Sequence, residues 1–208
     1  MEINEIETDE DYNNFMTYIK TQDYSYKSII EIELDNFLDT HKWGGSGIER
    51  SCFEFILKNI EIGSGIIEIG SGYCSTKAFS KFYKLTSIDD NIEYINIYDD
   101  VNYIHAPITG FITLPPVISP FKNSWYDVKI IVENLPDDYK MVFVDGPLGS
   151  GNRGALLNNL NIFKKDTIFI FHDTYREHEI KLANDVASKL NKKITFHSGG
   201  GDSWAMVG

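Results

Sequence analysis

Short apolar runs alternate with amphipathic helical segments along most of this chain, and this alternation restricts its fold more than any other feature. The apolar runs read GIIEIG, LTSID, VNYIHA, YKMVFVDG and DTIFIFHD. Helical segments such as STKAFSKFYK and REHEIKLANDVASKL follow several of them. This pattern is typical of βαβ units, which build a mainly parallel sheet covered by helices. The sequence therefore predicts a doubly wound α/β fold.

The C-terminal end of the pattern completes this prediction. KKITFH and DSWAMVG read as a last pair of strands joined by the turn at 199–201, which adds one antiparallel edge strand. We therefore expect a Rossmann-like, seven-stranded, mostly parallel sheet. WYDVKIIVENL and RGALLNNLNIFK are predicted helices, and the Pro-rich segment 109–124 is a predicted loop over the substrate.

The first part of the chain departs from the alternating pattern. Residues 1–47 are rich in acids and have mixed helical and strand character, and we interpret them as a helical N-terminal extension or lid. The glycine cluster in HKWGGSG then interrupts the chain. IERSCFEFILKNI, with apolar residues at helical spacing, predicts the helix that opens the main domain, residues 48–208.

Composition excludes several classes of partner. The formal net charge is -12, so the basic face that a generic nucleic-acid binder needs is missing. No apolar run approaches the roughly 18 residues that span a bilayer, which argues against membrane insertion. The two cysteines form neither a disulfide framework nor a zinc motif. We expect a cytoplasmic protein, and homo-oligomers are compatible with this reading.

A glycine-rich turn follows the first predicted strand, in IIEIGSGYCST. Gly70 and Gly72 would let a ligand approach the main chain closely. Lys77 does not have the spacing of a phosphate-binding P-loop. A dinucleotide fingerprint would have glycine at the position of Ser75, and Glu68 would repel a pyrophosphate. A cofactor with an ammonium and a sulfonium group, by contrast, tolerates a nearby carboxylate.

The second predicted strand ends in SIDDN, where an acid can accept hydrogen bonds from both ribose hydroxyls of a nucleoside. Asp89 is the first choice and Asp90 the alternate. Ser75 or Thr76 is expected to cap the next helix, and His105 to lie near the adenine edge. The full predicted cofactor set is Glu68, Gly70, Ser71, Gly72, Ser75, Thr76, Asp89, Asp90, His105 and Asp145.

EIGSGYCST together with SIDD resembles the class I S-adenosylmethionine-dependent methyltransferases, from about residue 48 to the end of the chain. YKMVFVDGPLGSGNRGALLNNL and TIFIFHDTYREHE resemble a sugar-directed group of O-methyltransferases, similar to plant glucuronoxylan methyltransferases and related bacterial proteins. The matching positions are Asp145, Gly146, Pro147, Gly149, Arg153, His172, Asp173, Arg176 and Glu179.

The resemblance implies S-adenosylmethionine as cofactor and a hydroxyl of a sugar, sugar nucleotide or glycan as acceptor, in glycan biosynthesis. A sugar alcohol is a weak acid, so its proton needs a base or a metal. His172 is the expected base because an imidazole pKa lies near neutrality. Alternatively Asp145, His172 and Asp173 hold a divalent cation, either Mg²⁺, Mn²⁺ or a transition metal. The expected substrate-binding residues are Arg153, Tyr175 and Arg176.

Other interpretations stay open at this point. An NAD-dependent oxidoreductase would share the fold and the acid at the second strand tip. A phenolic methyl acceptor would depend less on His172, and a non-catalytic module would keep the fold alone. Asp145 also suits a structural turn, and Asp173 suits a helix N-cap.

Overall fold

The computed structural model describes residues 29–44, 47–109, 125–147, 153–199 and 202–208. The chain divides into two compact units, Met1–His41 and Lys42–Gly208. Of the elements in the described residues, helix α2 (Ile29–Thr40) belongs to the first unit and the others belong to the second. The expected domain boundary after residue 47 stays a prediction. From residue 110 onward the expected Pro-rich loop lies outside the described residues.

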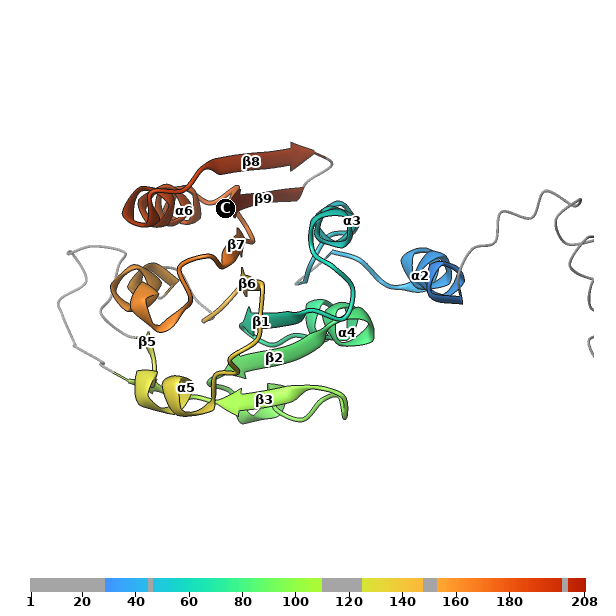
Figure 1. The fold of residues 1–208 in the computed structure, drawn as a ribbon, viewed down its shortest axis with the longest axis horizontal. Helices are drawn as coiled ribbons and strands as arrows, with labels where there is room; N and C mark the ends of the chain where they lie inside the picture. The colour runs from blue at the N-terminus through green and yellow to red at the C-terminus, as the bar shows by residue number, and fades with distance from the viewer. Residues whose placement is uncertain (1–28, 45–46, 110–124, 148–152, 200–201) are drawn as a thin grey trace, which may run out of the picture. The chain divides into compact units, whose positions relative to one another are not determined.

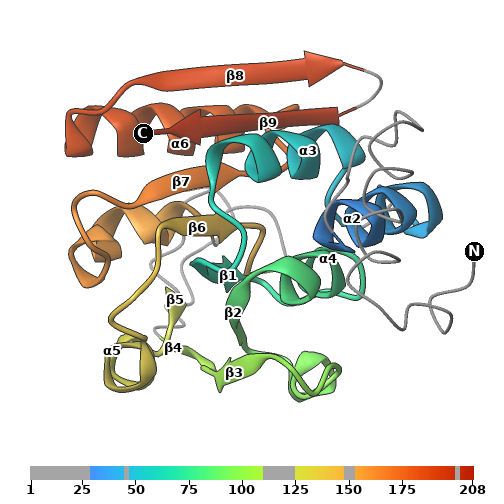
Figure 2. The same cartoon turned by 45° about the vertical axis from the view of Figure 1, so that its right-hand side comes forward.

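The second unit is built around a seven-stranded sheet in the order β3-β2-β1-β6-β7-β9-β8 (Figures 1 and 2). Five strands are parallel: β3 (Asn102–His105), β2 (Lys84–Asp89), β1 (Gly65–Ile69), β6 (Met141–Val144) and β7 (Ile168–Phe171). β9 (Asp202–Val207) pairs antiparallel with β7 and with the edge strand β8 (Ile194–Gly199). The predicted sheet is therefore confirmed.

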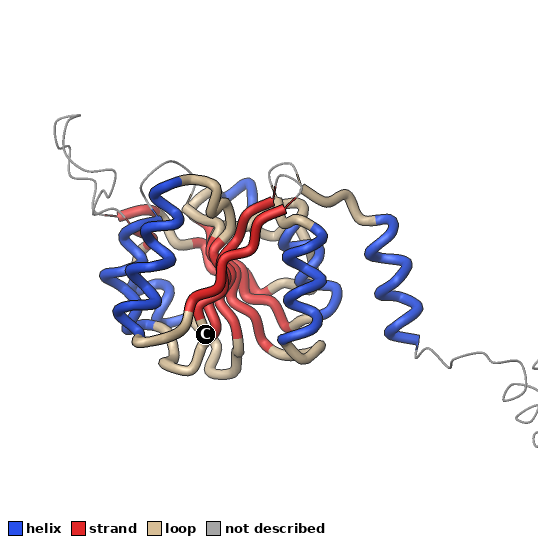
Figure 3. Tube along the Cα trace, turned by 90° about the horizontal axis from the view of Figure 1, so that it is seen from above, coloured by secondary structure: helices blue, strands red, loops and turns tan. Residues whose placement is uncertain are grey.

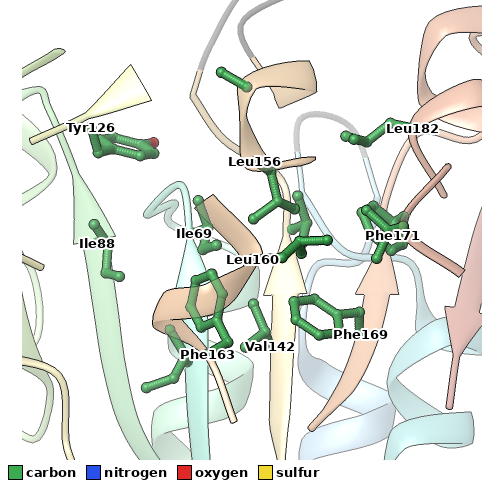
Figure 4. Close-up of a cluster of buried hydrophobic side chains, with 14 of the residues drawn as sticks. Ile69, Ile88, Tyr126, Val142, Leu156, Leu160, Phe163, Phe169, Phe171 and Leu182 are labelled. Carbon is green, nitrogen blue, oxygen red and sulfur yellow. The ribbon is translucent and has the colours of Figure 1, made fainter. Parts of the chain in front are cut away.

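Helices cover both faces of this sheet, as Figure 3 shows. On one face, Phe53 of α3 (Arg50–Asn59) packs against Phe79 of α4 (Ser75–Phe82), and Phe79 packs against Phe143 of β6. The other face carries the main core cluster, to which α5 (Val128–Asn134), η3 (Arg153–Ile162) and α6 (Glu177–Leu190) contribute. In Figure 4, Leu156 and Leu160 of η3, together with Phe163 just after it, lie over residues of β1, β6 and β7.

Two segments differ from the sequence prediction. Trp125 and Tyr126 form a short strand, β5 (Trp125–Tyr126), paired with β4 (Ile108–Thr109), and the predicted helix starts only at Val128. Asp127 explains this start, because its carboxylate accepts the backbone N–H groups of Lys129 and Ile130 and so caps the helix. The predicted helix over RGALLNNLNIFK is a 3₁₀ helix, η3.

Parallel strands buried on both faces explain the apolar runs in the sequence. All residues of β1 and β6 are buried. Glu68 is the one ionisable residue of β1, and its side chain is fully buried like its apolar neighbours. None of the described helices combines the length and apolar character that crossing a bilayer requires.

Candidate active site

The sheet reverses its strand order between β1 and β6, and this is where ligands bind in open α/β sheets. β1 is followed by the turn at Gly70, and β6 by Asp145 and Gly146. The two turns are in backbone contact, since a Cβ atom added to Gly70 would lie 2.6 Å from the nitrogen of Gly146. Because β1, β2, β6 and β7 are parallel, their carboxyl ends lie at one edge.

Gly70 and Gly72 differ in what they require of the chain. Gly70 has a φ of 94° and its α-carbon lies against Gly146, whereas a Cβ atom at Gly72 would meet only Ser75 Oγ at 3.6 Å. We expect Gly70→Ala to lower the free energy of unfolding by about 3 kcal/mol, because it adds left-handed backbone strain to a backbone clash. Gly72→Ala, the matched control, should change it by less than about 1 kcal/mol. Urea unfolding measures both, and equal losses would contradict the assignment.

Glu68 stabilises the glycine turn through a network of hydrogen bonds. Its Oε2 accepts the hydroxyl groups of Thr76 and Ser87, both at 2.6 Å. Thr76 Oγ1 in turn accepts the N–H of Gly72 at 2.8 Å, and the hydroxyls of Ser71 and Ser87 are 2.7 Å apart. Burial raises the pKa of Glu68 to about 7. The carboxylate in the strand therefore fixes the shape of the turn rather than lining its surface.

Asp89 lies at the tip of β2, beside this turn. Its Oδ2 accepts the N–H of Ser71 at 2.8 Å and its Oδ1 accepts the N–H of Asn91 at 2.7 Å. Burial raises the pKa of Asp89 above its ordinary value, and these two hydrogen bonds oppose the rise. Each carboxylate oxygen keeps a second lone pair for a ligand.

The remaining residues of the predicted cofactor set surround this network. Nε2 of His105 donates to the carbonyl of Asp90 at 3.1 Å, at the end of β3. Ser75 and Thr76 are buried in the first turn of α4, and the expectation that one of them caps the helix is wrong. The residue before α4 is Cys74, and it makes no side-chain cap. The hydroxyl of Thr76 serves Glu68 and Gly72 instead.

A second polar cluster lies at the tips of β6 and β7. Nδ1 of His172 is 3.1 Å from Oδ1 of Asp145 and 3.6 Å from Oδ1 of Asp173. Nε2 of the same ring is 2.8 Å from Oε2 of Glu49, which immediately precedes α3. His172 is 4% exposed. Asp173 has a φ of 60° and does not cap α6, whose N-cap is Arg176.

These contacts change the protonation expected for His172. Burial alone would lower its pKa, but the hydrogen bonds with Asp145 and Glu49 raise the pKa to about 10. The expectation of an imidazole pKa near neutrality is therefore wrong for this arrangement. A carboxylate only accepts hydrogen bonds, so the ring donates from both nitrogens and is a cation at neutral pH.

Arg153 holds the carboxylates of this cluster together from η3. Its Nη2 lies 2.8 Å from Asp145 Oδ1 and 3.3 Å from Asp173 Oδ2, and its Nη1 lies 3.6 Å from Glu179 Oε1. Arg153 is 5% exposed and Glu179 is 2% exposed. Burial raises the pKa of Glu179 to about 7, while Arg153 opposes that rise. Arg153 is therefore part of the internal framework of the site.

The exposed rim of the cluster is formed by Tyr175 and Arg176. Nη1 of Arg176 pairs with Asp173 at 2.9 Å, and its Nη2 donates to the Tyr175 hydroxyl at 2.8 Å. The guanidinium also lies over the Tyr175 ring, 5.1 Å from its centre. Tyr175 is 62% exposed, so its ring is open to a ligand.

The donor set of Asp145, His172 and Asp173 fits a divalent cation in type and spacing. Each offers one ligand atom, and the three atoms lie within 4.8 Å of one another. Carboxylate and imidazole donors suit Mg²⁺ or Mn²⁺ and also transition metals. A cation here would compete with Arg153 and His172 for Asp145 Oδ1, and His172 would have to lose its Nδ1 proton to act as a ligand.

Two residues of this region were missed by sequence reasoning. Glu49 lies 123 residues before its partner His172, and no spacing rule links them. The signal in the sequence is an acid at the predicted start of a helix that leads into the first strand. Ser87 was not among the predicted site residues, yet it donates to Glu68.

A groove lies between α3 and the β8–β9 hairpin. Ser51 lines it two residues after Glu49, and Trp204 lines it next to Ser203, whose carbonyl accepts the N–H of Thr174. Its volume is about 610 Å³. His197 stacks on Trp204 with ring centres 3.8 Å apart, and Phe55 packs against both rings. The full lining is Ser51, Glu54, Phe55, Lys58, Phe196, His197, Ser198 and Trp204.

Comparison with known proteins rests on structure alone. No protein-family model matches the sequence, and no curated protein matches it. A methyltransferase from Geobacter sulfurreducens has a TM-score of 0.51 at 12% identity, over 94% of this chain and 95% of that chain. The precorrin-8w decarboxylase of Methanobacterium thermoautotrophicum has a TM-score of 0.50 at 14% identity, over 81% of this chain and 96% of that chain.

A third similar structure is MycE, a methyltransferase from the mycinamycin biosynthetic pathway in complex with Mg and SAH. Its TM-score is 0.50 at 12% identity, over 84% of this chain and 53% of that chain. Likenesses at such low identity concern the fold and not the reaction. The chain therefore shares the fold of the class I S-adenosylmethionine-dependent methyltransferases.

Proposed function

We propose that this protein transfers a methyl group from S-adenosylmethionine to a hydroxyl group of a sugar, sugar nucleotide or glycan. The observation that carries the proposal is the backbone contact between Gly70 and Gly146 at the switch point. This contact joins the turn beside Asp89 to the strand tip that bears Asp145. A methyl donor on the first and an acceptor on the second would be held for in-line transfer.

The shape and charge of the first half suit an S-adenosyl cofactor. The Gly70–Gly72 turn offers main-chain groups, and Asp89 offers lone pairs to two ribose hydroxyls. A sulfonium and an ammonium are favoured by the carboxylate of Asp145, whereas a pyrophosphate would be repelled by it. The SAH complex of MycE supports the same choice.

The second half supplies groups for an acceptor hydroxyl. A divalent cation bound here would lower the pKa of that hydroxyl and ease loss of its proton. Asp145, His172 and Asp173 would hold such a cation, and the Mg complex of MycE supports one. Arg153 fixes the Asp145 carboxylate, and Arg176 fixes that of Asp173. Both acids are thereby oriented before the acceptor binds.

The surroundings favour a sugar over a phenol. The open ring of Tyr175 provides a stacking face beside the guanidinium of Arg176. The groove along α3 combines aromatic rings with hydroxyl, carboxylate and ammonium groups. Such mixed surfaces match the apolar faces and many hydroxyls of a pyranose ring. A phenolic acceptor would need fewer polar contacts.

Cofactor binding is the first test. Isothermal calorimetry with S-adenosylhomocysteine should detect binding to the wild-type protein, and NAD should bind no better than background. Asp89→Ala should weaken S-adenosylhomocysteine binding by about a hundredfold, since it removes charged hydrogen bonds to the ribose. The matched control is Asp90→Ala, which should change binding by less than about threefold. Binding of NAD in place of S-adenosylhomocysteine would contradict the proposal.

The role of a cation is tested separately. Methyl transfer to a panel of sugars and nucleotide sugars is measured with chelator-treated protein and again after Mg²⁺ or Mn²⁺ is restored. We expect turnover to fall on chelation and to return with the cation. Turnover that is unchanged by chelation would contradict a role for the cation.

A further inference from the structure

Glu49 lies outside every motif considered so far, yet it contacts the most buried titratable ring of the candidate site. Its Oε2 is 2.8 Å from Nε2 of His172, which is 4% exposed. A carboxylate accepts and never donates when ionised, so Nε2 carries the hydrogen of this bond. This leaves Nδ1 as the nitrogen that faces Asp145 and Asp173.

A ring held only through Nδ1 could turn about its Cβ–Cγ bond. The second contact, through Nε2, removes that freedom. The ring also packs against Phe143, with the two ring centres 5.8 Å apart. In catalytic triads and metal sites, a carboxylate that accepts a hydrogen bond from one ring nitrogen orients the other nitrogen of the histidine. Glu49 stands in the same relation to His172.

Close packing of the chain just before α3 fixes the position of Glu49. Gly44 has a φ of 77° and donates its N–H to the carbonyl of Ile48 at 3.0 Å. Gly47 passes so close to Cys74 that an added Cβ atom would lie 2.3 Å from the Cys74 Cβ. Ile48 is fully buried. The start of α3 is therefore fixed against the glycine turn of the cofactor half.

We propose that Glu49 is a positioning residue of the methyl transfer, which holds Nε2–H of His172 so that Nδ1 faces the Asp145–Asp173 carboxylates. This inference rests on the proposed function for its kinetic consequence. Its structural consequence, the fixed ring, does not depend on any reaction. The two parts are therefore tested by different measurements.

The structural part is tested by NMR of protein labelled with ¹⁵N-histidine, without ligand. The wild-type protein should show a slowly exchanging ring Nε2–H signal, assigned to His172 by its absence in His172→Ala. Glu49→Ala should abolish that protection, whereas Glu49→Gln, which keeps an acceptor oxygen, should retain it. An unchanged signal in Glu49→Ala would overturn the proposal, even if the protein methylates no acceptor in the panel.

The kinetic part uses the same variants on any acceptor that the wild-type protein methylates. Glu49→Ala should lower kcat by about a hundredfold, and Glu49→Gln should recover it to within about tenfold of wild type. KM and the affinity for S-adenosylhomocysteine should stay within about twofold in both. The control is Glu133→Ala on α5, where an exposed carboxylate pairs with Lys129 away from the candidate site. A loss seen only in KM, in cofactor affinity or in thermal stability would assign Glu49 a merely structural role.

Discussion

Alanine in place of His172 is expected to reduce kcat by about a thousandfold, while affinity for S-adenosylhomocysteine changes by less than about twofold. The ring lies at the tip of β7 beside Asp145, Asp173 and Glu49, and within the described residues it has no hydrogen bond or ion pair with the glycine turn. Whether it binds a cation or positions the two aspartates, its loss is expected to act on the acceptor half.

A radiometric methyl-transfer assay measures this turnover, and calorimetry measures the cofactor affinity. His178→Ala is the control, because His178 lies on α6 beside Glu179 rather than between the two aspartates. We expect the control to keep its turnover within about twofold. A His172→Ala protein with wild-type kcat would take the ring out of the reaction.

Replacement of Arg153 by methionine should lower the free energy of unfolding by about 3–5 kcal/mol near neutral pH. The side chain is 6% exposed and is the shared cation of Asp145, Asp173 and Glu179. Removing one partner of a buried ion pair leaves uncompensated charge in a low-dielectric environment, and here three carboxylates lose that partner. Methionine keeps much of the volume, so the loss reports on charge rather than on a cavity.

Urea unfolding at neutral pH gives this difference. Arg176→Met is the matched control, because that guanidinium also pairs with Asp173 but its side chain is 39% exposed. A pair screened by solvent should contribute less than about 1 kcal/mol. If Arg153→Met cost no more than Arg176→Met, the buried carboxylates would not depend on Arg153.

Much of this fold could be predicted from the sequence, because parallel strands buried on both faces leave uninterrupted apolar runs. The runs at Met141–Val144 and Ile168–Phe171 are of this kind. Local polar effects were harder to foresee. Asp127 stops the helix from extending back over Trp125, and a two-residue pairing with Ile108 and Thr109 takes its place. A pairing of only two residues leaves no periodic signal in the sequence.

The site could be predicted in part, for a related reason. Residues that follow parallel strands meet at one edge, so Asp89, Asp145 and His172 could be expected near one another. The direction of the Glu68 side chain could not, since alternation alone does not say which face holds the Thr76 and Ser87 hydroxyls. Glu49 approaches from before the first strand. Its contact with His172 depends on tertiary packing around Gly47, which leaves no pattern in one sequence.

A crystal structure with S-adenosylhomocysteine would probe most directly the idea that both turns at the β1–β6 boundary serve one reaction centre. The account predicts the ribose on Asp89, the nucleoside along Gly70–Gly72, and the sulfur directed toward the Asp145 and His172 side chains. A ligand bound elsewhere, or one whose sulfur points away from that pair, would contradict it.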